Sequence, residues 1–260
     1  MFVDQYDSFL LDMDGVVHVG DSAVPGAVDA IRELRDRGKT VRFVTNNSRA
    51  SRETLVEDLR GFGIDADPED VVSAAWATAE YLAEQDVEAV SLVGGEGFAE
   101  MVRGHGIAVR DENVDAVVVG HDHTIDYDDL ERATQLIYEE GTDLVAANAD
   151  GWYPTPDGIA PGTGATVAAI EAATGVEATV VGKPEPELFE IAMEGLPADR
   201  TVMIGDNPQS DLVGADTAGI DAILVTGTGE DVDAGSVDEV GVGPIATVND
   251  LSGLFEESPR

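Results

Sequence analysis

The sequence predicts an α/β fold: a Rossmann-like core built on a parallel sheet, with a second α/β domain inserted into it. Short apolar segments alternate along the chain with amphipathic helical patterns, and this alternation builds parallel sheets through right-handed crossovers. Each segment that we expect to form a core strand ends in polar residues. Since ligands bind at the carboxyl ends of the strands in open sheets of this kind, these polar residues mark the candidate site.

Four strands are expected in the core, and they occur in both halves of the chain. Their sequences are SFLLDMD (residues 8–14), KTVRFVTNNS (39–48), TVMIGDN (201–207) and DAILVTG (221–227). Apolar residues recur with helical spacing over residues 27–37, 52–61 and 188–194. Each of these helices follows a strand or a strand-end loop, as a parallel sheet requires.

The middle of the chain contains further apolar segments that end in polar residues, but these polar residues differ from those of the core. EAVSLVGG (88–95), VDAVVVGHDHT (114–124) and TDLVAANADGW (142–152) each predict a strand and the loop that follows it. The stretch from Asp12 to Thr45 is too short to hold an inserted domain, whereas the stretch from Thr45 to Lys183 is long enough. We therefore expect a core formed by residues 1–82 and 180–260, with a cap domain at residues 83–179.

The charge of the chain is extreme. It contains 53 acidic and 14 basic residues, which give a formal net charge of −39 and a pI of about 4.1. The acids are spread along the whole chain, so a disordered acidic tail is not the explanation. This pattern favours a halophilic protein adapted to molar intracellular salt, where the Debye length falls to about 3 Å; a generic acidic protein is the alternative. With no basic patch, nucleic acid is disfavoured as a partner.

Several features indicate a cytoplasmic protein. No apolar run approaches the roughly 20 residues that cross a bilayer, so no membrane partner is expected. The N-terminal stretch MFVDQYDSFLLD has no basic region before its apolar run, unlike a signal peptide. There is no cysteine, so the chain has neither disulfides nor a thiolate metal site.

The polar strand ends together suggest one kind of chemistry. They are Asp12 with Asp14, Thr45 with Asn46, Lys183 with Pro184, and Asp206 with Asp211. Carboxylates that converge on a sheet edge would bind Mg²⁺, which prefers oxygen ligands and favours the ionised carboxylates. The Thr45 hydroxyl, the Asn46 amide and the Lys183 ammonium would bind an oxyanion. This combination is suited to phosphoryl transfer.

Four motifs carry a resemblance to a known family. DMDGV (12–16), FVTNNS (43–48), VVGKPEP (180–186) and IGDNPQSD (204–211) resemble, in the right order, the four motifs of the haloacid dehalogenase (HAD) superfamily. The chain looks most similar to the NagD-like, 4-nitrophenylphosphatase subgroup, which has a C2-type cap. PGTGATVAAIEAATG (161–175) is similar to that cap. The resemblance therefore implies a HAD-like hydrolase core with an inserted cap.

The resemblance also implies a role for each motif residue. Asp12 would be the nucleophile that forms an aspartyl-phosphate, and Asp14 would act first as acid and then as base. Mg²⁺ would be bound by Asp12, Asp206 and the backbone carbonyl of Asp14. The remaining assignments are phosphate binding by Thr45, Asn46 and Lys183, and support of the metal waters or the lysine by Asn207 and Asp211.

The implied substrate is a small phosphorylated metabolite, such as a sugar phosphate, a nucleoside monophosphate or phosphoglycolate. A phosphotransferase or mutase that uses the same aspartyl-phosphate is an alternative, and so is a non-catalytic protein that binds phosphorylated metabolites. Such a non-catalytic protein would be expected to lack Asp12 or Asp14, and both are present. The resemblance also makes a homodimer a candidate assembly.

Within the cap, Asn148, Asp150 and Tyr153 are candidates for contact with the substrate. The GHDH sequence places His121 and His123 close together, but four histidines and no cysteine are a poor supply of zinc ligands. The sequence alone assigns these two histidines no role.

Overall fold

The computed structural model describes residues 1–155, 158–227, 237 and 239–256. The chain divides into two compact units. The larger comprises Met1–Thr45, Glu53–Val72 and Lys183–Arg260, and the smaller comprises Asn46–Arg52 and Ser73–Gly182. This division differs from the boundaries expected at residues 83 and 179. Helix α3 (Ala74–Glu84) packs against α4 (Glu96–Gly104), so residues 73–82 belong to the smaller unit.

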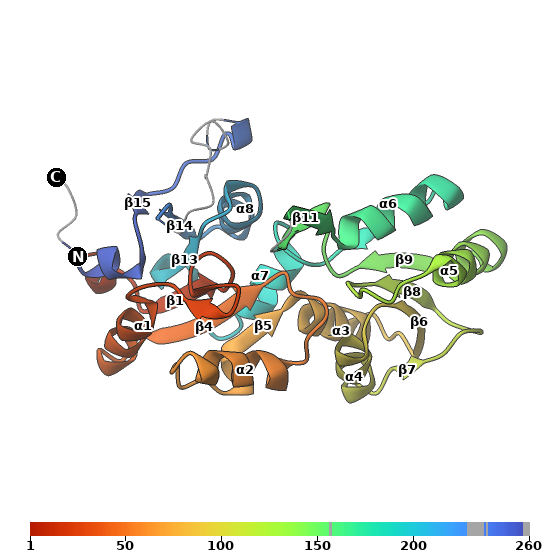
Figure 1. Ribbon diagram of the computed structural model, residues 1–260, viewed down its shortest axis with the longest axis horizontal. Helices are drawn as coiled ribbons and strands as arrows, with labels where there is room; N and C mark the ends of the chain where they lie inside the picture. The colour runs from red at the N-terminus through yellow and green to blue at the C-terminus, as the bar shows by residue number, and fades with distance from the viewer. Residues whose placement is uncertain (156–157, 228–236, 238, 257–260) are drawn as a thin grey trace. The chain divides into compact units, whose positions relative to one another are not determined.

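The larger unit is built on a six-stranded sheet with the order β15-β14-β13-β1-β4-β5. Its strands are β1 (Ser8–Asp12), β4 (Thr40–Thr45), β5 (Val71–Ser73), β13 (Thr201–Gly205), β14 (Asp221–Val225) and β15 (Ala246–Val248). Strand β1 pairs in parallel with both β4 and β13, so strands from the two ends of the chain lie side by side, red beside blue in Figure 1. Asp12 pairs in register with Val44 of β4. Consequently Asp12 and Thr45 end their strands at the same edge of the sheet.

Burial explains why these segments form strands. All five residues of β1 are buried, and so are all five of β13. Continuous apolar runs of this kind are typical of parallel strands that are covered on both faces. Helix α1 (Ala27–Asp36) buries Ala27, Ala30, Ile31 and Leu34, which recur with the spacing of one helix face.

The remaining elements of this unit are short. Its helices are α2 (Arg52–Gly61, of which Arg52 belongs to the smaller unit), α7 (Pro186–Ala192) and α8 (Val213–Ala218). A two-stranded hairpin, β2 (His18–Val19) and β3 (Ser22–Ala23), follows β1. Short helical turns are η1 (Phe2–Asp4), η2 (Pro68–Asp70), η3 (Ala198–Arg200), η5 (Leu251–Phe255) and the π-helical η4 (Pro208–Leu212).

The smaller unit has its own five-stranded parallel sheet with the order β12-β9-β8-β6-β7. Its strands are β6 (Ala89–Val93), β7 (Ala108–Val109), β8 (Ala116–Val119), β9 (Asp143–Ala146) and β12 (Thr179–Val180). Helices α5 (Tyr127–Glu140) and α6 (Thr163–Thr174) pack against it through a buried cluster that includes Val117, Leu144 and Ile170. An antiparallel hairpin, β10 (Trp152–Thr155) and β11 (Gly158–Pro161), precedes α6.

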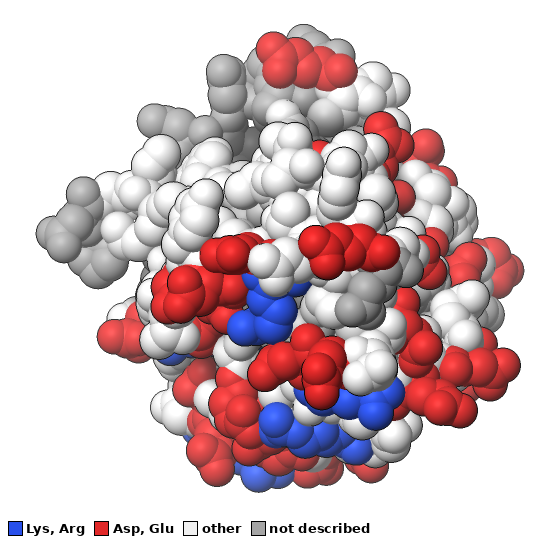
Figure 2. Space-filling view, turned by 90° about the vertical axis from the view of Figure 1, so that its right-hand side faces the viewer, with Lys and Arg blue, Asp and Glu red and all other residues white. Residues whose placement is uncertain are grey.

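The predicted fold class, α/β with a parallel Rossmann-like core, is confirmed. In the part of the chain that the structure describes, no helix combines the length and apolarity needed to cross a bilayer. Figure 2 shows acidic side chains spread over one face of the molecule, with few basic side chains between them.

Candidate active site

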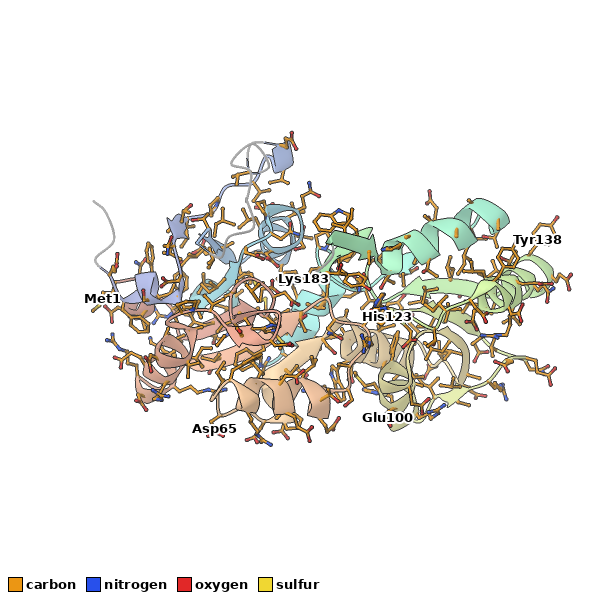
Figure 3. The ribbon with its side chains drawn as sticks, in the orientation of Figure 1. Met1, Asp65, Glu100, His123, Tyr138 and Lys183 are labelled. Atoms are coloured by element: carbon orange, nitrogen blue, oxygen red, sulfur yellow. The ribbon has the colours of Figure 1, made fainter. Side chains whose placement is uncertain are left out.

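A buried lysine between two carboxylates lies at the carboxyl edge of the larger sheet. Asp12 is the last residue of β1 and is 7% exposed, while Lys183 is 3% and Asp211 0% exposed. Lys183 Nζ donates to Asp12 Oδ1 and to Asp211 Oδ1, each at 2.7 Å. Figure 3 labels Lys183 on the ribbon. Asp12, Lys183 and Asp211 come from distant parts of the sequence, and the structure joins them into one ion-paired group.

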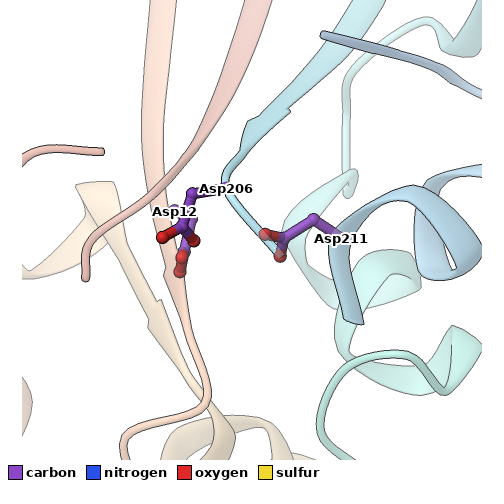
Figure 4. Close-up of side chains that lie close together, drawn as sticks. All are labelled: Asp12, Asp206 and Asp211. Atoms are coloured by element: carbon purple, nitrogen blue, oxygen red, sulfur yellow. The ribbon is translucent and has the colours of Figure 1, made fainter. Parts of the chain in front are cut away.

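Asp206 adds a third carboxylate to this edge. Asp12, Asp206 and Asp211 can each place an oxygen within 4.8 Å of the others (Figure 4). Asp12 ends β1, Asp206 follows β13, and Asp211 lies in η4. Carboxylate oxygens are the donors that hard divalent cations such as Mg²⁺ prefer, so this donor set fits the metal expected from the sequence.

Asp211 uses both carboxylate oxygens within the protein. Oδ1 accepts from Lys183, and Oδ2 accepts from the backbone N–H of Asn207 at 3.1 Å. A Cβ on Gly205 would lie 2.2 Å from Asp211 Oδ2, so only glycine lets the carboxylate approach the end of β13. The Asn207 side chain accepts from the N–H of Gln209 and caps the η4 turn. These contacts support the predicted role of Asp211 in orienting the lysine.

Asp14 lies in different surroundings from Asp12. Its side chain is 75% exposed, and its Oδ1 is 3.9 Å from His18 Nε2. Gly15, which follows Asp14 and precedes the β2–β3 hairpin, has a φ of +77°, a backbone angle that favours glycine. A Cβ at this position would lie 1.9 Å from Asp206 Oδ2, so a side chain there would displace Asp206.

Burial and the neighbouring charges both shift the pKa values of Asp12 and Lys183. Burial raises the pKa of the Asp12 carboxyl well above its ordinary value, Lys183 opposes this rise, and the carboxylates of Asp211 and Asp206 add to it. Burial by itself would lower the pKa of the Lys183 ammonium, but Asp12 and Asp211 together raise it above its ordinary value. Lys183 is therefore a permanent cation at neutral pH. A bound metal ion would lower the pKa of Asp12, as the charge of Lys183 does, and so favour the ionised carboxylate.

Thr45 and Asn46 follow each other in the chain but belong to different units. Thr45 ends β4 and is 1% exposed, and Lys183 Nζ lies 3.5 Å from the carbonyl of its neighbour Val44. In the smaller unit, Asn46 Nδ2 donates to both oxygens of Asp150 at 3.2 Å. The carbonyl of Asn46 accepts from Asn148 Nδ2 at 2.7 Å. Asn46 thus joins two of the predicted substrate-contacting residues of the cap.

The third of those residues, Tyr153, lies in a group that includes residues not predicted from the sequence. Its hydroxyl is 3.2 Å from His123 Nδ1, and His123 Nε2 is 3.0 Å from Arg49 Nη1. His121 packs against the Tyr153 ring at a centroid distance of 4.7 Å. Arg49 was missed because it matches no motif residue; its position in the FVTNNSR stretch was the one available signal.

Two family models match most of the chain outside the middle of the smaller unit. One, described as haloacid dehalogenase-like hydrolase, matches residues 9–108, and another, described as HAD-hydrolase-like, matches residues 180–253. The chain is also 37% identical to an acid sugar phosphatase of Staphylococcus aureus over 225 residues, which are 85% of this chain and 86% of that protein. The chain belongs to the haloacid dehalogenase-like hydrolases.

Other comparisons indicate the subgroup. This HAD hydrolase is 35% identical to the 5′-nucleotidase YutF of Bacillus subtilis over 85% of this chain and 87% of that protein. It is similar to the p-nitrophenyl phosphatase from Archaeoglobus fulgidus, with a TM-score of 0.90, 29% identity, and coverage of 95% and 97% of the two chains. For NagD from E. coli the TM-score is 0.88 and the identity 26%, with 95% and 98% covered. The predicted NagD-like membership is confirmed, and this HAD hydrolase is a phosphatase.

Proposed function

We propose that this HAD phosphatase hydrolyses small phosphate monoesters in a Mg²⁺-dependent reaction through an aspartyl-phosphate on Asp12. The observation that carries the proposal is the buried Lys183 ammonium held between Asp12 and Asp211, with Asp206 beside them. The names of the relatives include an acid sugar phosphatase and a 5′-nucleotidase. Sugar phosphates and nucleoside monophosphates are therefore the first substrates to test, together with phosphoglycolate.

The proposed reaction has two steps that share one acid–base group. A carboxylate oxygen of Asp12 attacks phosphorus, the bond from phosphorus to the ester oxygen breaks, and Asp14 donates a proton to the leaving alcohol. A water molecule then attacks the aspartyl-phosphate, Asp14 accepts its proton, and inorganic phosphate leaves. The exposure of the Asp14 side chain supports this role, because the group must exchange protons with alcohol and water.

The surrounding residues would bind the phosphoryl group and the metal. Lys183 supplies a permanent positive charge, and Thr45 and Asn46 are proposed to donate hydrogen bonds to the phosphoryl oxygens. Mg²⁺ would be held by Asp12, Asp206 and the carbonyl of Asp14. When bound, the ion neutralises charge on the carboxylates and on the transferring phosphoryl group.

The cap residues and the acidic composition extend the proposal to the substrate and to the salt conditions in which the enzyme works. Asn148, Asp150 and Tyr153 are proposed to contact the part of the substrate that leaves with the alcohol. The composition supports a halophilic source and a cytoplasm with molar salt, since the chain has 53 acidic residues and only 14 basic ones.

Replacing the nucleophile tests the proposal directly. In a panel of phosphate esters with Mg²⁺ and high KCl, Asp12→Asn should lower the rate of phosphate release by at least about 10³-fold. Chelation by EDTA should abolish the wild-type activity, and added Mg²⁺ should restore it. Asp58→Asn, at an exposed position on α2, is the matched control and should keep the wild-type rate.

The outcomes separate the alternatives. Turnover of Asp12→Asn at the wild-type rate would show that Asp12 is not the nucleophile. Transfer of the phosphoryl group to another alcohol, without release of inorganic phosphate, would indicate a phosphotransferase or mutase. Binding of esters without either product would indicate a sensor.

A further inference from the structure

His18 lies beside Asp14 in the larger unit and has no role in the proposed reaction. It begins β2, and backbone hydrogen bonds close the turn that separates it from Asp14. The N–H groups of Val17 and His18 donate to the carbonyl of Met13 at 2.9 and 3.0 Å. The N–H of Gly15 donates to the carbonyl of His18 at 2.8 Å. The backbone of His18 is therefore fixed next to the residue that carries the proposed acid–base group.

The imidazole ring of His18 is held on two sides. Its Nδ1 is 3.1 Å from the carbonyl oxygen of Gly20, and because a carbonyl only accepts, Nδ1 donates this hydrogen bond. The ring also stacks on the ring of Phe62, with centroids 5.3 Å apart and an interplanar angle of 24°. Phe62 directly follows α2, and its N–H donates to the carbonyls of Asp58 and Leu59 at 3.1 Å. These contacts favour one orientation of the His18 ring.

The other ring nitrogen of His18 faces the carboxyl group of Asp14. Nε2 is 3.9 Å from Asp14 Oδ1, and the side chain of His18 is 16% exposed whereas that of Asp14 is 75% exposed. At this distance the two groups touch but do not form a hydrogen bond. Among the residues that the structure describes, the Asp14 carboxyl has no hydrogen-bond partner, so the ring is the contact that limits its rotation on this side.

Restricted rotation matters for a group that transfers protons. An exposed aspartate side chain on a turn ordinarily samples several staggered rotamers. A proton donor is efficient only when its oxygen lies within hydrogen-bond reach of the atom that receives the proton. A fixed ring beside the carboxyl removes the rotamers that would occupy the same space. The carboxyl then spends a larger share of its time in the remaining rotamers.

We propose that His18 is a positioning residue for Asp14. Its ring, held by Gly20 and Phe62, restricts the Asp14 carboxyl to the rotamers from which it exchanges protons with the leaving alcohol and with water. This inference rests on the proposed function and deepens it, because it gives the β2–β3 hairpin and the end of α2 a part in the acid–base step. The role depends on the shape of the ring and not on its charge. A stack that only stabilised the hairpin would have different kinetic consequences.

Two phosphate esters separate the acid step from the other steps. 4-Nitrophenolate leaves readily without a proton, whereas a sugar alkoxide needs one, so Asp14 as an acid matters mainly for the sugar phosphate. The esters compared are 4-nitrophenyl phosphate and the sugar phosphate with the highest kcat/KM in the ester panel. Because kcat/KM covers the steps up to departure of the alcohol, it excludes hydrolysis of the aspartyl-phosphate. It is measured for wild type, His18→Ala, His18→Phe and Asp14→Asn, with Asp58→Asn as the control.

The removal of the ring should affect the two esters unequally. His18→Ala should lower kcat/KM for the sugar phosphate by about tenfold, and for 4-nitrophenyl phosphate by less than about twofold. His18→Phe retains a ring that can stack on Phe62, and it should restore most of the activity toward the sugar phosphate. Equal losses on both esters would show that the stack only stabilises the site, and would overturn the proposal. A loss in His18→Phe as large as in His18→Ala would overturn it as well.

A double-mutant cycle shows whether His18 acts through Asp14. In the Asp14→Asn background, His18→Ala should cause little further loss on the sugar phosphate, since no acid remains to be positioned. Losses that simply multiply would overturn the proposal. Turnover of Asp14→Asn at the wild-type rate would contradict the proposed function itself. A loss in Asp14→Asn without any loss in His18→Ala would overturn the role of His18 alone.

Discussion

The ion-paired lysine is the residue that most constrains this enzyme. Lys183 is buried between Asp12 and Asp211, and its pKa is raised by both despite the opposing effect of burial. Buried ion pairs of this kind add little net stability, because desolvation offsets much of the attraction. Removal of the lysine would leave two buried carboxylates without their cation. The arrangement is therefore better explained by the chemistry of the site than by the stability of the fold.

A tyrosine far from this site should make stability depend on pH. The Tyr6 hydroxyl donates to Asp221 Oδ2 at 2.6 Å, and burial, this bond and the Asp221 charge raise the pKa of Tyr6 above its ordinary value. A raised pKa in the folded state stabilises the protein below the unfolded value of about 10, and this contribution is lost as the pH rises further. Tyr6→Phe should therefore unfold more easily at pH 7, by about 1 kcal/mol, and this difference should shrink above about pH 10.

Urea unfolding at several pH values measures this difference. Tyr138→Phe removes an exposed phenol on α5 and is the control for the chemical change. If the difference in the free energy of unfolding between wild type and Tyr6→Phe stayed constant up to pH 11 and beyond, the linkage of Tyr6 to stability would be contradicted.

At the residue scale, the sequence was most informative where residues end a strand. Asp12, Asp206 and Lys183 were predicted to converge, since parallel strands bring their carboxyl ends to one edge, and the structure places them there. Arg49 and His123 were not predicted to meet. They are 74 residues apart, and their contact depends on how loops of the smaller unit pack, which no local pattern encodes.

At the scale of elements, segments with a strong burial pattern were predictable and junctions were not. The strands β1, β4, β13 and β14 appear where continuous apolar runs predicted them. Helix α7 begins at Pro186, earlier than expected from its apolar spacing, because proline is favoured in the first turn of a helix. The join at Ser73 was missed, because no loop-like composition separates β5 from α3 and because the Ser73 side chain caps that helix.

The capping of α5 offers a test at this scale. The Asp126 side chain accepts from the N–H groups of Asp128 and Asp129, and the Asp129 side chain accepts from the N–H of Asp126. Asp126→Ala should therefore destabilise the smaller unit by about 1 kcal/mol, visible as a lower Tm. Glu139→Ala, in the last turn of the same helix, is the control. It should be neutral or slightly stabilising, because an acid is unfavourable near the helix C-terminus. Equal losses in both variants would rule out the capping explanation.

At the scale of the whole molecule, charge is the dominant feature. A net charge of −39 on 260 residues makes the folded surface repel itself in dilute buffer, and acids are spread over the face seen in Figure 2. An anionic substrate approaching the enzyme experiences the same repulsion. Both effects weaken as the Debye length falls from about 10 Å at 0.1 M salt to about 3 Å at 1 M.

Stability and activity should accordingly rise together with KCl. If screening is the cause, most of the gain in Tm and in kcat/KM should be complete by about 1 M KCl, because the Debye length is then close to the size of an ion. Sucrose of equal osmolality is the control, since it favours compact states without screening charge. A variant in which the exposed Glu100, Glu112 and Glu139 are replaced by lysine should depend less steeply on salt, because its repulsion in dilute buffer is smaller. An enzyme that is fully folded and fastest in dilute buffer would contradict adaptation of this surface to high salt.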